Sequence, residues 1–418
     1  MTINNEHKKL NVPNLRFKEF EGEWEKKTIG EISTIKNGPF GSVLHAEDYV
    51  NEGMPIVTTE HFKNGNLPLS KNGIPQVSDD DYYRLRGYKL EKDDIVFSRV
   101  GSIDINAHVE QSQQGWLFSG RVLRVRPIKS VNSLCLHYIL STESVKRSIR
   151  NRAVGQTMPS INTPILSNTK INIPQSVVEQ KKIANLLALL DKRIAIQNKI
   201  IDDLQSLIKG LEDNLLDNPL WEKTYLRSFM QFFPTNSLSW EQLSYKEGAI
   251  RNLHYGLIHS FQTRGINSAS LPMIKNEAVP KQYMLCQVGD VAFADASEDT
   301  GEIAKSVEFV DTIEGDTICG LHTIHGRDIK NRTVVGFKGF AFNSRYFHNQ
   351  IKRLAQGTKV FSITANNLSS CYVYLPDLEK QKAIVNLLKT YEAKLLVSKR
   401  LLEHYEKQKQ YLLRQMFI

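Results

Sequence analysis

An apolar residue recurs at every third or fourth position between residues 183 and 215, in a stretch that contains no proline. The spacing alternates between four and three throughout, which is the heptad pattern of a helix that buries one stripe against a partner helix. We therefore predict a long helix over residues 176–217, with one polar member in its stripe, Gln197. The complete stripe is Ile183, Leu187, Leu190, Ile194, Gln197, Ile201, Leu204, Ile208, Leu211 and Leu215.

The same pattern recurs 201 residues later, over 376–418, and there Ser398 takes the place of Gln197. The entry sequence recurs as well, because Gln180-Lys181 reappears as Gln381-Lys382. Two copies in register indicate a tandem duplication of a globular part followed by a long helix. We expect the two helices to pair as an antiparallel coiled coil, with Gln197 and Ser398 meeting and setting the register. The second stripe is Ile384, Leu388, Tyr391, Leu395, Ser398, Leu402, Tyr405, Lys409, Leu412 and Met416.

The duplication predicts an α+β chain with a pseudo-twofold internal repeat. The ends of the two globular parts match at an offset of 202 residues, as Gly155 does with Gly357, while their interiors differ. One frame would therefore present two different surfaces. In the first part we expect a single helix over residues 133–152. The predicted segments are a flexible arm at 1–12, a first globular domain at 13–175, a helix at 176–217, a second domain at 218–375 and a helix at 376–418.

Charge and composition limit the function classes. The formal net charge is +9 and the pI is near 9.1, so an acidic partner such as nucleic acid is favoured. No apolar run approaches the ~20 residues that a membrane span needs, so we expect no membrane role and a cytoplasmic location. None of the four cysteines forms a C-x-x-C pair, which predicts neither a zinc knuckle nor a disulfide framework.

Catalytic motifs are missing from the sequence. It contains no P-loop, no G-x-S-x-G and no H-E-x-x-H. His322-x-x-His325 has a spacing open to metal ligands but suits polar surface groups better, and Asn218-Pro219 fits a turn better than a methyltransferase loop. Asp377 and Glu379 are explained by the preference of acids for a helix start. We expect no catalytic residue, no metal and no cofactor in this chain.

With these features the sequence resembles the specificity subunits of type I restriction-modification enzymes. The residues that carry the resemblance are Asn11 to Phe17 with Trp24-Glu25, and the two helix entries, Pro174…Glu179-Gln180-Lys181 and Pro376…Gln381-Lys382. The second copy departs from the pattern at Lys380 and Lys409.

The resemblance implies two target recognition domains, each reading one half of a bipartite double-stranded DNA site, and a coiled coil that sets the spacer. It also implies partners: two methyltransferase subunits using S-adenosylmethionine, and restriction motor-nuclease subunits using ATP and Mg. The chain itself would be non-catalytic. Two other functions stay open: a coiled-coil assembly protein without a DNA role, and a self-contained DNA-modifying enzyme.

Reading DNA needs donors and acceptors on loops together with cations for phosphate. Polar residues near the turns of each globular part meet that description. The candidates in the first part are Lys36, Asn37, Ser42, Arg99, Ser102, Arg150, Arg152, Gln156, Thr157 and Ser160. Those in the second part are Arg251, Asn252, His254, Tyr255, Ser297, Lys352, Arg353, Gln356, Thr358 and Lys359.

Overall fold

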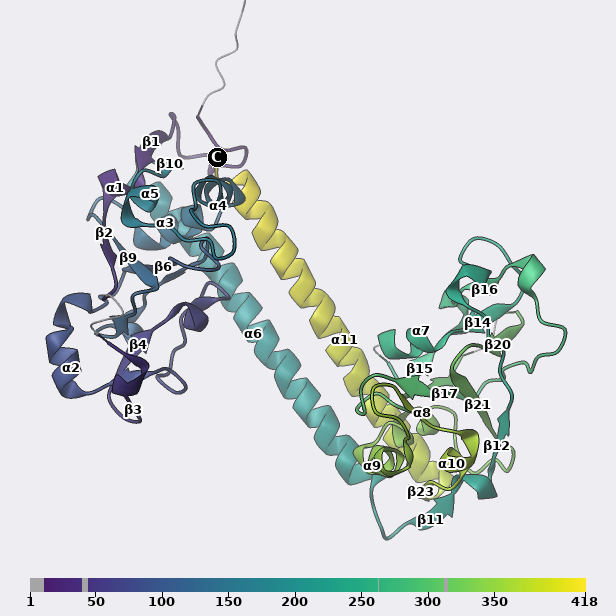
Figure 1. Cartoon of the computed structure of the whole chain (residues 1–418). Coiled ribbons are helices and arrows are strands. Elements are labelled where there is room, and N and C mark those ends of the chain that lie inside the picture. The colour runs from purple at the N-terminus through teal and green to yellow at the C-terminus, as the bar shows by residue number, and fades with distance from the viewer. Residues whose placement is uncertain (1–10, 40–43, 262, 312–314) are drawn as a thin grey trace, which may run out of the picture. The chain divides into compact units, whose positions relative to one another are not determined.

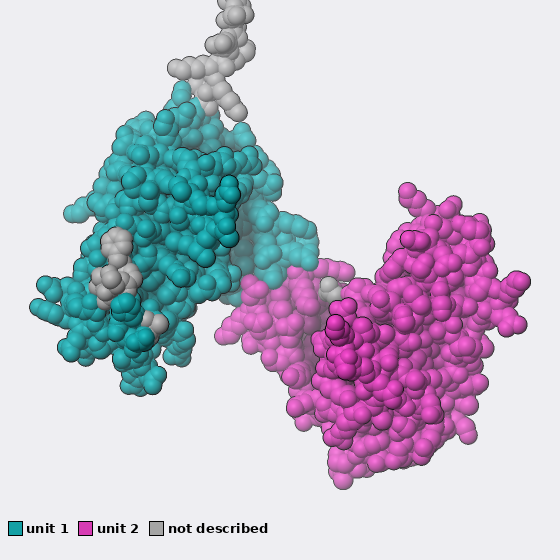
Figure 2. Space-filling view, viewed as in Figure 1, with its two compact units in different colours: residues 1–196, 402–418 teal, residues 197–401 magenta. Residues whose placement is uncertain are grey.

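A computed structural model describes residues 11–39, 44–261, 263–311 and 315–418 (Figure 1). The chain forms two compact units, which Figure 2 colours separately. Unit 1 comprises residues 1–196 and 402–418, and unit 2 comprises residues 197–401. In the described part of the chain, no helix combines the length and apolar character that crossing a membrane requires.

Unit 1 is built on a four-stranded antiparallel sheet in the order β2-β9-β6-β7, joined by a second, mixed sheet in the order β3-β5-β4-β8. Strands β1 and β10 pair separately, next to the start of the long helix α6. The elements are β1 (Glu25–Thr28), α1 (Ile29–Ile32), β2 (Ser33–Asn37), β3 (Tyr49–Val50), β4 (Met54–Val57), β5 (Gln76–Val77), α2 (Asp79–Arg84), β6 (Ile95–Ser98), β7 (Asn106–His108), β8 (Leu117–Phe118), β9 (Val122–Pro127), α3 (Ser133–Leu140), α4 (Glu143–Arg150), α5 (Thr163–Ser167), β10 (Lys170–Ile173) and α6 (Val177–Leu216).

Unit 2 repeats this plan with additions. Its larger sheet has the order β12-β21-β17-β19-β15, and its smaller sheet the order β13-β16-β14-β20. The elements are β11 (Glu222–Tyr225), β12 (Met230–Phe233), β13 (Leu243–Ser244), β14 (Arg251–Leu253), α7 (Tyr255–Ser260), β15 (Gly265–Ile266), β16 (Met273–Ile274), β17 (Val291–Ala294), β18 (Ala296–Ser297), β19 (Ser306–Phe309), β20 (Thr317–Cys319), β21 (Thr323–Asp328), α8 (Phe337–Ala341), α9 (Arg345–Leu354), β22 (Phe361–Ser362), α10 (Ala365–Ser369), β23 (Tyr372–Leu375) and α11 (Leu378–Gln415).

The long helices α6 and α11 run within the predicted segments 176–217 and 376–418, and they pair antiparallel inside each unit. In unit 1, Lys409 Nζ lies 2.5 Å from Asp191 Oδ1, so the charge in the second stripe is neutralised. In unit 2, Gln197 Nε2 donates to the Ser398 carbonyl oxygen at 3.2 Å. The two polar members of the stripes therefore meet, although Ser398 takes part through its backbone. The register role of this contact stays a prediction.

The repeated entry sequence has a structural role. Gln180 is buried, accepts from the Asn132 amide at 2.7 Å and donates to the Pro174 carbonyl at 2.8 Å. Gln381 does the same in unit 2, with the Val334 amide at 3.0 Å and the Pro376 carbonyl at 3.0 Å. Each glutamine thus ties the first turn of a long helix to its own domain.

The second copy carries Lys380 where the first carries Glu179, and contacts of the N-terminal segment in unit 1 explain this difference. Its counterpart Glu179 is buried and accepts from Arg16 at 2.7 and 2.9 Å and from the Trp24 indole at 3.3 Å. In unit 2 the same position carries Lys380, which is exposed and pairs with Asp377 at 2.9 Å. An acid is required only where an arginine packs against the helix start.

Two predictions need correction. The predicted helix over 133–152 is broken, because Thr142 has an extended backbone and begins α4 as its N-cap. The predicted flexible arm is too long, because Asn11 bonds the Trp24 carbonyl through Nδ2 at 2.6 Å and accepts from the Trp24 amide at 2.8 Å. Residues 1–10 of that arm lie outside the described residues.

Candidate nucleic-acid interface

Two of the predicted groups in unit 1 lie side by side. The backbone of Val100 bridges to that of Ser160, and the Gly101 amide donates to the Pro159 carbonyl at 2.9 Å. The Ile161 amide donates to the Arg99 carbonyl at 2.9 Å. These bonds join the loop after β6 to the loop after α4. We call residues 99–102 with 154–160 the unit 1 loop pair.

Unit 2 contains the same arrangement. Strands β18 and β22 pair antiparallel, so that Ser297 lies opposite Phe361. The Ile363 amide donates to the Asp295 carbonyl at 3.0 Å, matching the bond between Ile161 and Arg99. We call residues 295–297 with 356–362 the unit 2 loop pair.

Both loop pairs depend on one glycine. Gly155 has a φ of +98° and Gly357 a φ of +128°, a region of backbone space that side chains rarely adopt. A Cβ atom at Gly155 would lie 2.8 Å from the Met158 carbonyl oxygen, and one at Gly357 would lie 2.0 Å from that of Val360. The matched glycines therefore permit the tight turn that presents the following side chains.

The unit 1 loop pair exposes Ser102, Gln156 and Thr157, while Ser160 is half-buried. Arg150 is exposed as well, but its guanidinium forms ion pairs with Asp104 and Glu143. An amide and two hydroxyls can both donate and accept hydrogen bonds, which is the capacity that base edges require.

Four other candidates in unit 1 are engaged inside the protein. Arg152 bonds Ser148, Asn168 and Thr169, and Arg99 Nη1 donates to the Gly120 carbonyl at 3.2 Å. Lys36 Nζ donates to the Gly87 carbonyl at 2.7 Å, and Asn37 accepts from Thr163 at 3.2 Å. These internal bonds hold the four side chains against the protein and occupy part of their hydrogen-bonding capacity. Ser42 lies outside the described residues.

Exposed cations lie in and beside the unit 2 loop pair. Lys352 and Arg353 lie in the last turn of α9, and Gln356, Thr358 and Lys359 follow it; all five are exposed. Ser297 is half-buried, and its Oγ accepts from the Asp299 amide at 3.1 Å. Three cations beside an amide and a hydroxyl combine phosphate-binding and base-reading groups.

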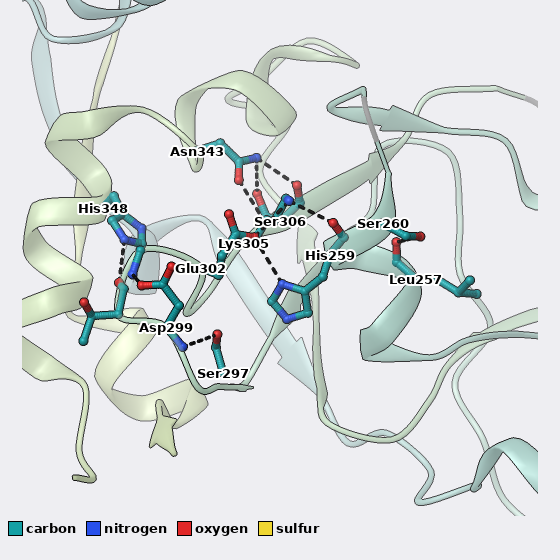
Figure 3. Close-up of polar contacts among 12 residues, drawn as sticks. Leu257, His259, Ser260, Ser297, Asp299, Glu302, Lys305, Ser306, Asn343 and His348 are labelled. Carbon is teal, nitrogen blue, oxygen red and sulfur yellow. Dashed lines mark hydrogen bonds and ion pairs between the residues drawn. The ribbon is translucent and has the colours of Figure 1, made fainter. Parts of the chain in front are cut away.

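Polar contacts fix the loop that continues from Ser297 (Figure 3). His348 bonds the Thr300 carbonyl at 2.9 Å, and Glu302 contacts His259 at 3.2 Å and Lys305 at 2.9 Å. Burial alone would raise the pKa of Glu302, but the hydrogen bonds from Lys305 and His259 outweigh it and lower that pKa. The carboxylate therefore stays ionised and holds the loop against α7.

Two candidates in unit 2 are corrected by their burial. Asn252 is fully buried on β14, inside the smaller sheet, so it cannot reach DNA in this fold. His254 is 3% exposed, stacks on Trp240 at 4.4 Å and accepts from the Gly256 amide at 3.2 Å as the N-cap of α7. Polar residue type alone did not reveal that these positions face a core.

The neighbours of these two residues are held as well. Arg251 donates to the carbonyls of Ala269 and Leu271 at 3.0 and 3.1 Å. Tyr255 is half-buried, with its ring edge-on to His322 at 5.3 Å. The predicted cluster at 251–255 thus contributes mainly to packing.

The His322-x-x-His325 pair is divided by the fold. His322 is exposed and contacts Asp295 at 3.0 Å. His325 is fully buried beside Cys286 and Cys319, and the ligand atoms of these three lie within 4.8 Å of one another. No sequence pattern reveals this grouping, because the three residues come from separate segments without the close spacing of a ligand motif.

Comparison with known proteins agrees with this architecture. The family model described as "Type I restriction modification DNA specificity domain" matches residues 21–206 and 320–406. A protein of Methanocaldococcus jannaschii, provisionally named the type I restriction enzyme MjaX specificity subunit, is 26% identical, with 96% of this chain and 95% of that protein covered.

Two solved structures share the fold. The S subunit of a type I restriction-modification system from M. genitalium has a TM-score of 0.61 at 15% identity, covering 97% of this chain and 99% of that one. A structure titled for complex assembly and conformational transition of the type I R-M system has a TM-score of 0.54 at 12% identity, covering 94% and 97%.

Proposed function

Since this chain belongs to the type I restriction-modification DNA specificity family, we propose that each of its two units reads one half of a bipartite double-stranded DNA site. The observation that carries the proposal is the repeated loop pair. Both units present a loop pair built on the same backbone bonds and the same turn glycine, yet with different side chains. A shared frame with unlike side chains suits two related readers of two different half-sites.

In unit 1 the reading groups are Ser102, Gln156 and Thr157. In unit 2 Gln356 and Thr358 read base edges, while Lys352, Arg353 and Lys359 bind phosphate. The net charge of +9 adds attraction to the DNA backbone.

The helices α6 and α11 hold the partners and set the spacer. Two methyltransferase subunits bind this antiparallel pair and supply catalysis with S-adenosylmethionine, and restriction subunits add a motor and nuclease that use ATP and Mg. The chain contributes no catalytic group of its own and works in the cytoplasm. The solved relative whose title concerns complex assembly supports a role within such a complex.

Mapping methylated sites tests the reading residues. The chain is expressed with its methyltransferase partner, and the wild type is compared with Gln356→Ala and Gln156→Ala. We expect each variant to relax one half of the methylated motif and to leave the other half unchanged. A variant that relaxes both halves equally would contradict separate reading.

Salt dependence tests the phosphate contacts. Lys359→Ala should weaken DNA binding of the complex on all sequences and lower the salt slope by about one. Lys380→Ala, an exposed lysine at the start of α11, is the matched control. Binding that does not respond to salt would favour an assembly protein without a DNA role, and methyl transfer by the purified chain alone would favour an enzyme.

An insertion tests the spacer. One extra helical turn in α6 after Lys199 adds ~5.4 Å, against ~3.4 Å per base pair. The preferred spacer should change by one or two base pairs, with both half-sites retained. An active variant that keeps the original spacer would exclude the coil as the measuring element.

A further inference from the structure

Three side chains with soft-metal chemistry meet inside unit 2. Cys286 precedes β17, Cys319 ends β20 and His325 lies on β21, and all three are buried. The Sγ atoms of Cys286 and Cys319 are 3.6 Å apart, and a ring nitrogen of His325 lies within 4.8 Å of both. All four cysteines of the chain are free thiols.

The imidazole of His325 is oriented as a ligand would be. Its Nε2 lies 2.7 Å from Asp290 Oδ2, and Asp290 is also held by Arg327 at 2.7 and 2.8 Å. Both carboxylate oxygens of Asp290 accept from the Arg327 guanidinium, which can only donate, so the carboxylate faces His325 as an acceptor. An acceptor opposite Nε2 favours the tautomer that donates from Nε2 and leaves Nδ1 as the ligand atom.

Nδ1 of His325 is buried and has no hydrogen-bond partner among the described residues. A buried polar atom without a partner costs about 1–3 kcal/mol, so a folded protein rarely leaves one. A carboxylate bonded to one ring nitrogen, which leaves the other nitrogen for a metal, is the common outer arrangement of metal-binding histidines.

The repeat supplies an internal comparison. The strand pairings place Leu90 of unit 1 where unit 2 has Cys286, and Arg124 where unit 2 has His325. The same pairings place Phe118 where unit 2 has Cys319. Unit 1 thus fills this part of its core with two apolar side chains, and unit 2 alone carries two thiols and an imidazole.

We propose that Cys286, Cys319 and His325 of unit 2 bind a thiophilic divalent cation, Zn²⁺. Each thiol loses its proton to solvent as its sulfur binds the metal, and His325 contributes the neutral Nδ1. Two thiolates balance the charge of the cation, so the loaded site adds no net charge to the core. Zinc–sulfur bonds of ~2.3 Å in a tetrahedron put two sulfurs ~3.8 Å apart, close to the 3.6 Å between Cys286 and Cys319.

The bound cation would join three segments that no covalent bond links: the segment before β17, the end of β20, and β21. Arg327 lies on β21, and Asp290 immediately precedes β17. Because both strands belong to the frame beneath the unit 2 loop pair, the bound cation would stiffen that frame. The three protein ligands leave one tetrahedral position for a small ligand such as water.

Metal analysis of the full chain tests the site. The purified protein is incubated with equimolar Zn²⁺, separated from free metal and assayed for zinc. We expect about one zinc per chain, and a lower melting temperature after chelation. Substitution with Co²⁺ should give the absorption bands of tetrahedral cobalt bound to thiolate. No retained zinc, or a cobalt spectrum without thiolate bands, would overturn the proposal without reference to any variant.

Substitution locates the ligands. Cys286→Ala and Cys319→Ala should abolish zinc retention and the cobalt–thiolate bands. Cys371→Ala is the matched control, because Cys371 is a buried thiol of the same unit outside the cluster. Zinc content equal in Cys286→Ala and wild type, or a Cys286–Cys319 disulfide in protein freshly isolated under non-reducing conditions, would contradict the site.

Discussion

The two units carry the same buried ion pair and use it differently. In unit 1, Arg126 donates to Asp94 at 2.6 and 2.8 Å, and in unit 2 Arg327 donates to Asp290 at 2.8 and 2.7 Å. In each unit the aspartate also accepts from a backbone amide three residues earlier. Only in unit 2 does a histidine join the aspartate.

A second pair separates the units further. Lys338 and Glu308 form a fully buried ion pair in unit 2, with 2.9 Å between Nζ and Oε1. In unit 1, the strand pairing places His108 at the position that Glu308 holds in unit 2. The bonds from Gln180 and Gln381 place Leu136 of unit 1 at the position of Lys338. The repeat thus preserves the backbone pairing and the aspartate–arginine pair, while the other side chains that fill the frame change between the units.

Among the changes that test this difference between the units, exchanging a whole domain should have the largest effect. Replacing residues 218–375 with the corresponding domain of a relative should change one half of the methylated motif completely. The other half should be retained, because residues 13–175 carry a separate loop pair. Mapping of methylated sites measures both halves, and the reciprocal exchange of 13–175 is the control.

Removing the buried lysine should have the next largest effect. Lys338→Leu makes unit 2 resemble unit 1 but leaves the Glu308 carboxylate buried without its cation, at a cost of about 3–5 kcal/mol. Adding Glu308→Gln should restore most of the stability measured by urea unfolding. Lys380→Leu, on an exposed ion pair, should change it by less than about 1 kcal/mol. Equal effects of the two lysine substitutions would remove the distinction.

The next largest effect should be a pH-dependent change in stability, which differs between the two units. Asp191 and Glu392 occupy equivalent positions in the two stripe-bearing helices, 201 residues apart. Asp191 pairs with Lys409, whereas Glu392 lies in a pocket of unit 2 lined by Glu212, Arg264 and Lys399 among others.

Burial raises the pKa of Glu392 to about 7, although Arg264 and Lys389 act in the opposite direction and Glu212 adds to the rise. Because the folded-state pKa exceeds the unfolded one, the folded state loses stability as pH rises toward 7. Glu392→Gln should therefore stabilise the chain at pH 8 by on the order of 1–3 kcal/mol and have little effect at pH 4. Asp191→Asn should destabilise it at pH 8. Unfolding curves at pH 4 and pH 8 measure both effects. An effect of Glu392→Gln that is the same at both pH values would contradict the raised pKa of Glu392.

The smallest effect is expected in the coil. Gln197→Leu removes a buried polar side chain from the stripe and should stabilise the helix pair by about 0.5–1 kcal/mol while loosening its register. Thermal unfolding measures the first change, and cysteine cross-linking between α6 and α11 measures the second. Lys199→Leu, an exposed neighbour, should alter neither.

The sequence was a good guide to the repeat and a weaker guide to the site. Heptad spacing predicted α6 and α11, and matched glycines marked both loop pairs, because these features are local or recur at a fixed offset. The burial of Asn252 and the contact between Cys286 and Cys319 were not predicted, because neither feature is local. Whether an asparagine is buried, and whether two cysteines 33 residues apart touch, depends on long-range strand pairing that no local pattern records.

Unit 1 is assembled from two segments of the chain that are far apart in sequence, and this has a consequence for biosynthesis. Its core includes Met416 and Phe417, and the Phe417 ring packs edge-on to Trp24 at 6.0 Å. These residues leave the ribosome only after all of unit 2, which takes roughly 10–40 s at 5–20 residues per second. Synthesis of unit 1 thus starts before that of unit 2 but ends after it, and until then the nascent chain holds an open apolar surface that chaperones could recognise. Loss of residues 402–418 should accordingly damage the unit that was translated first.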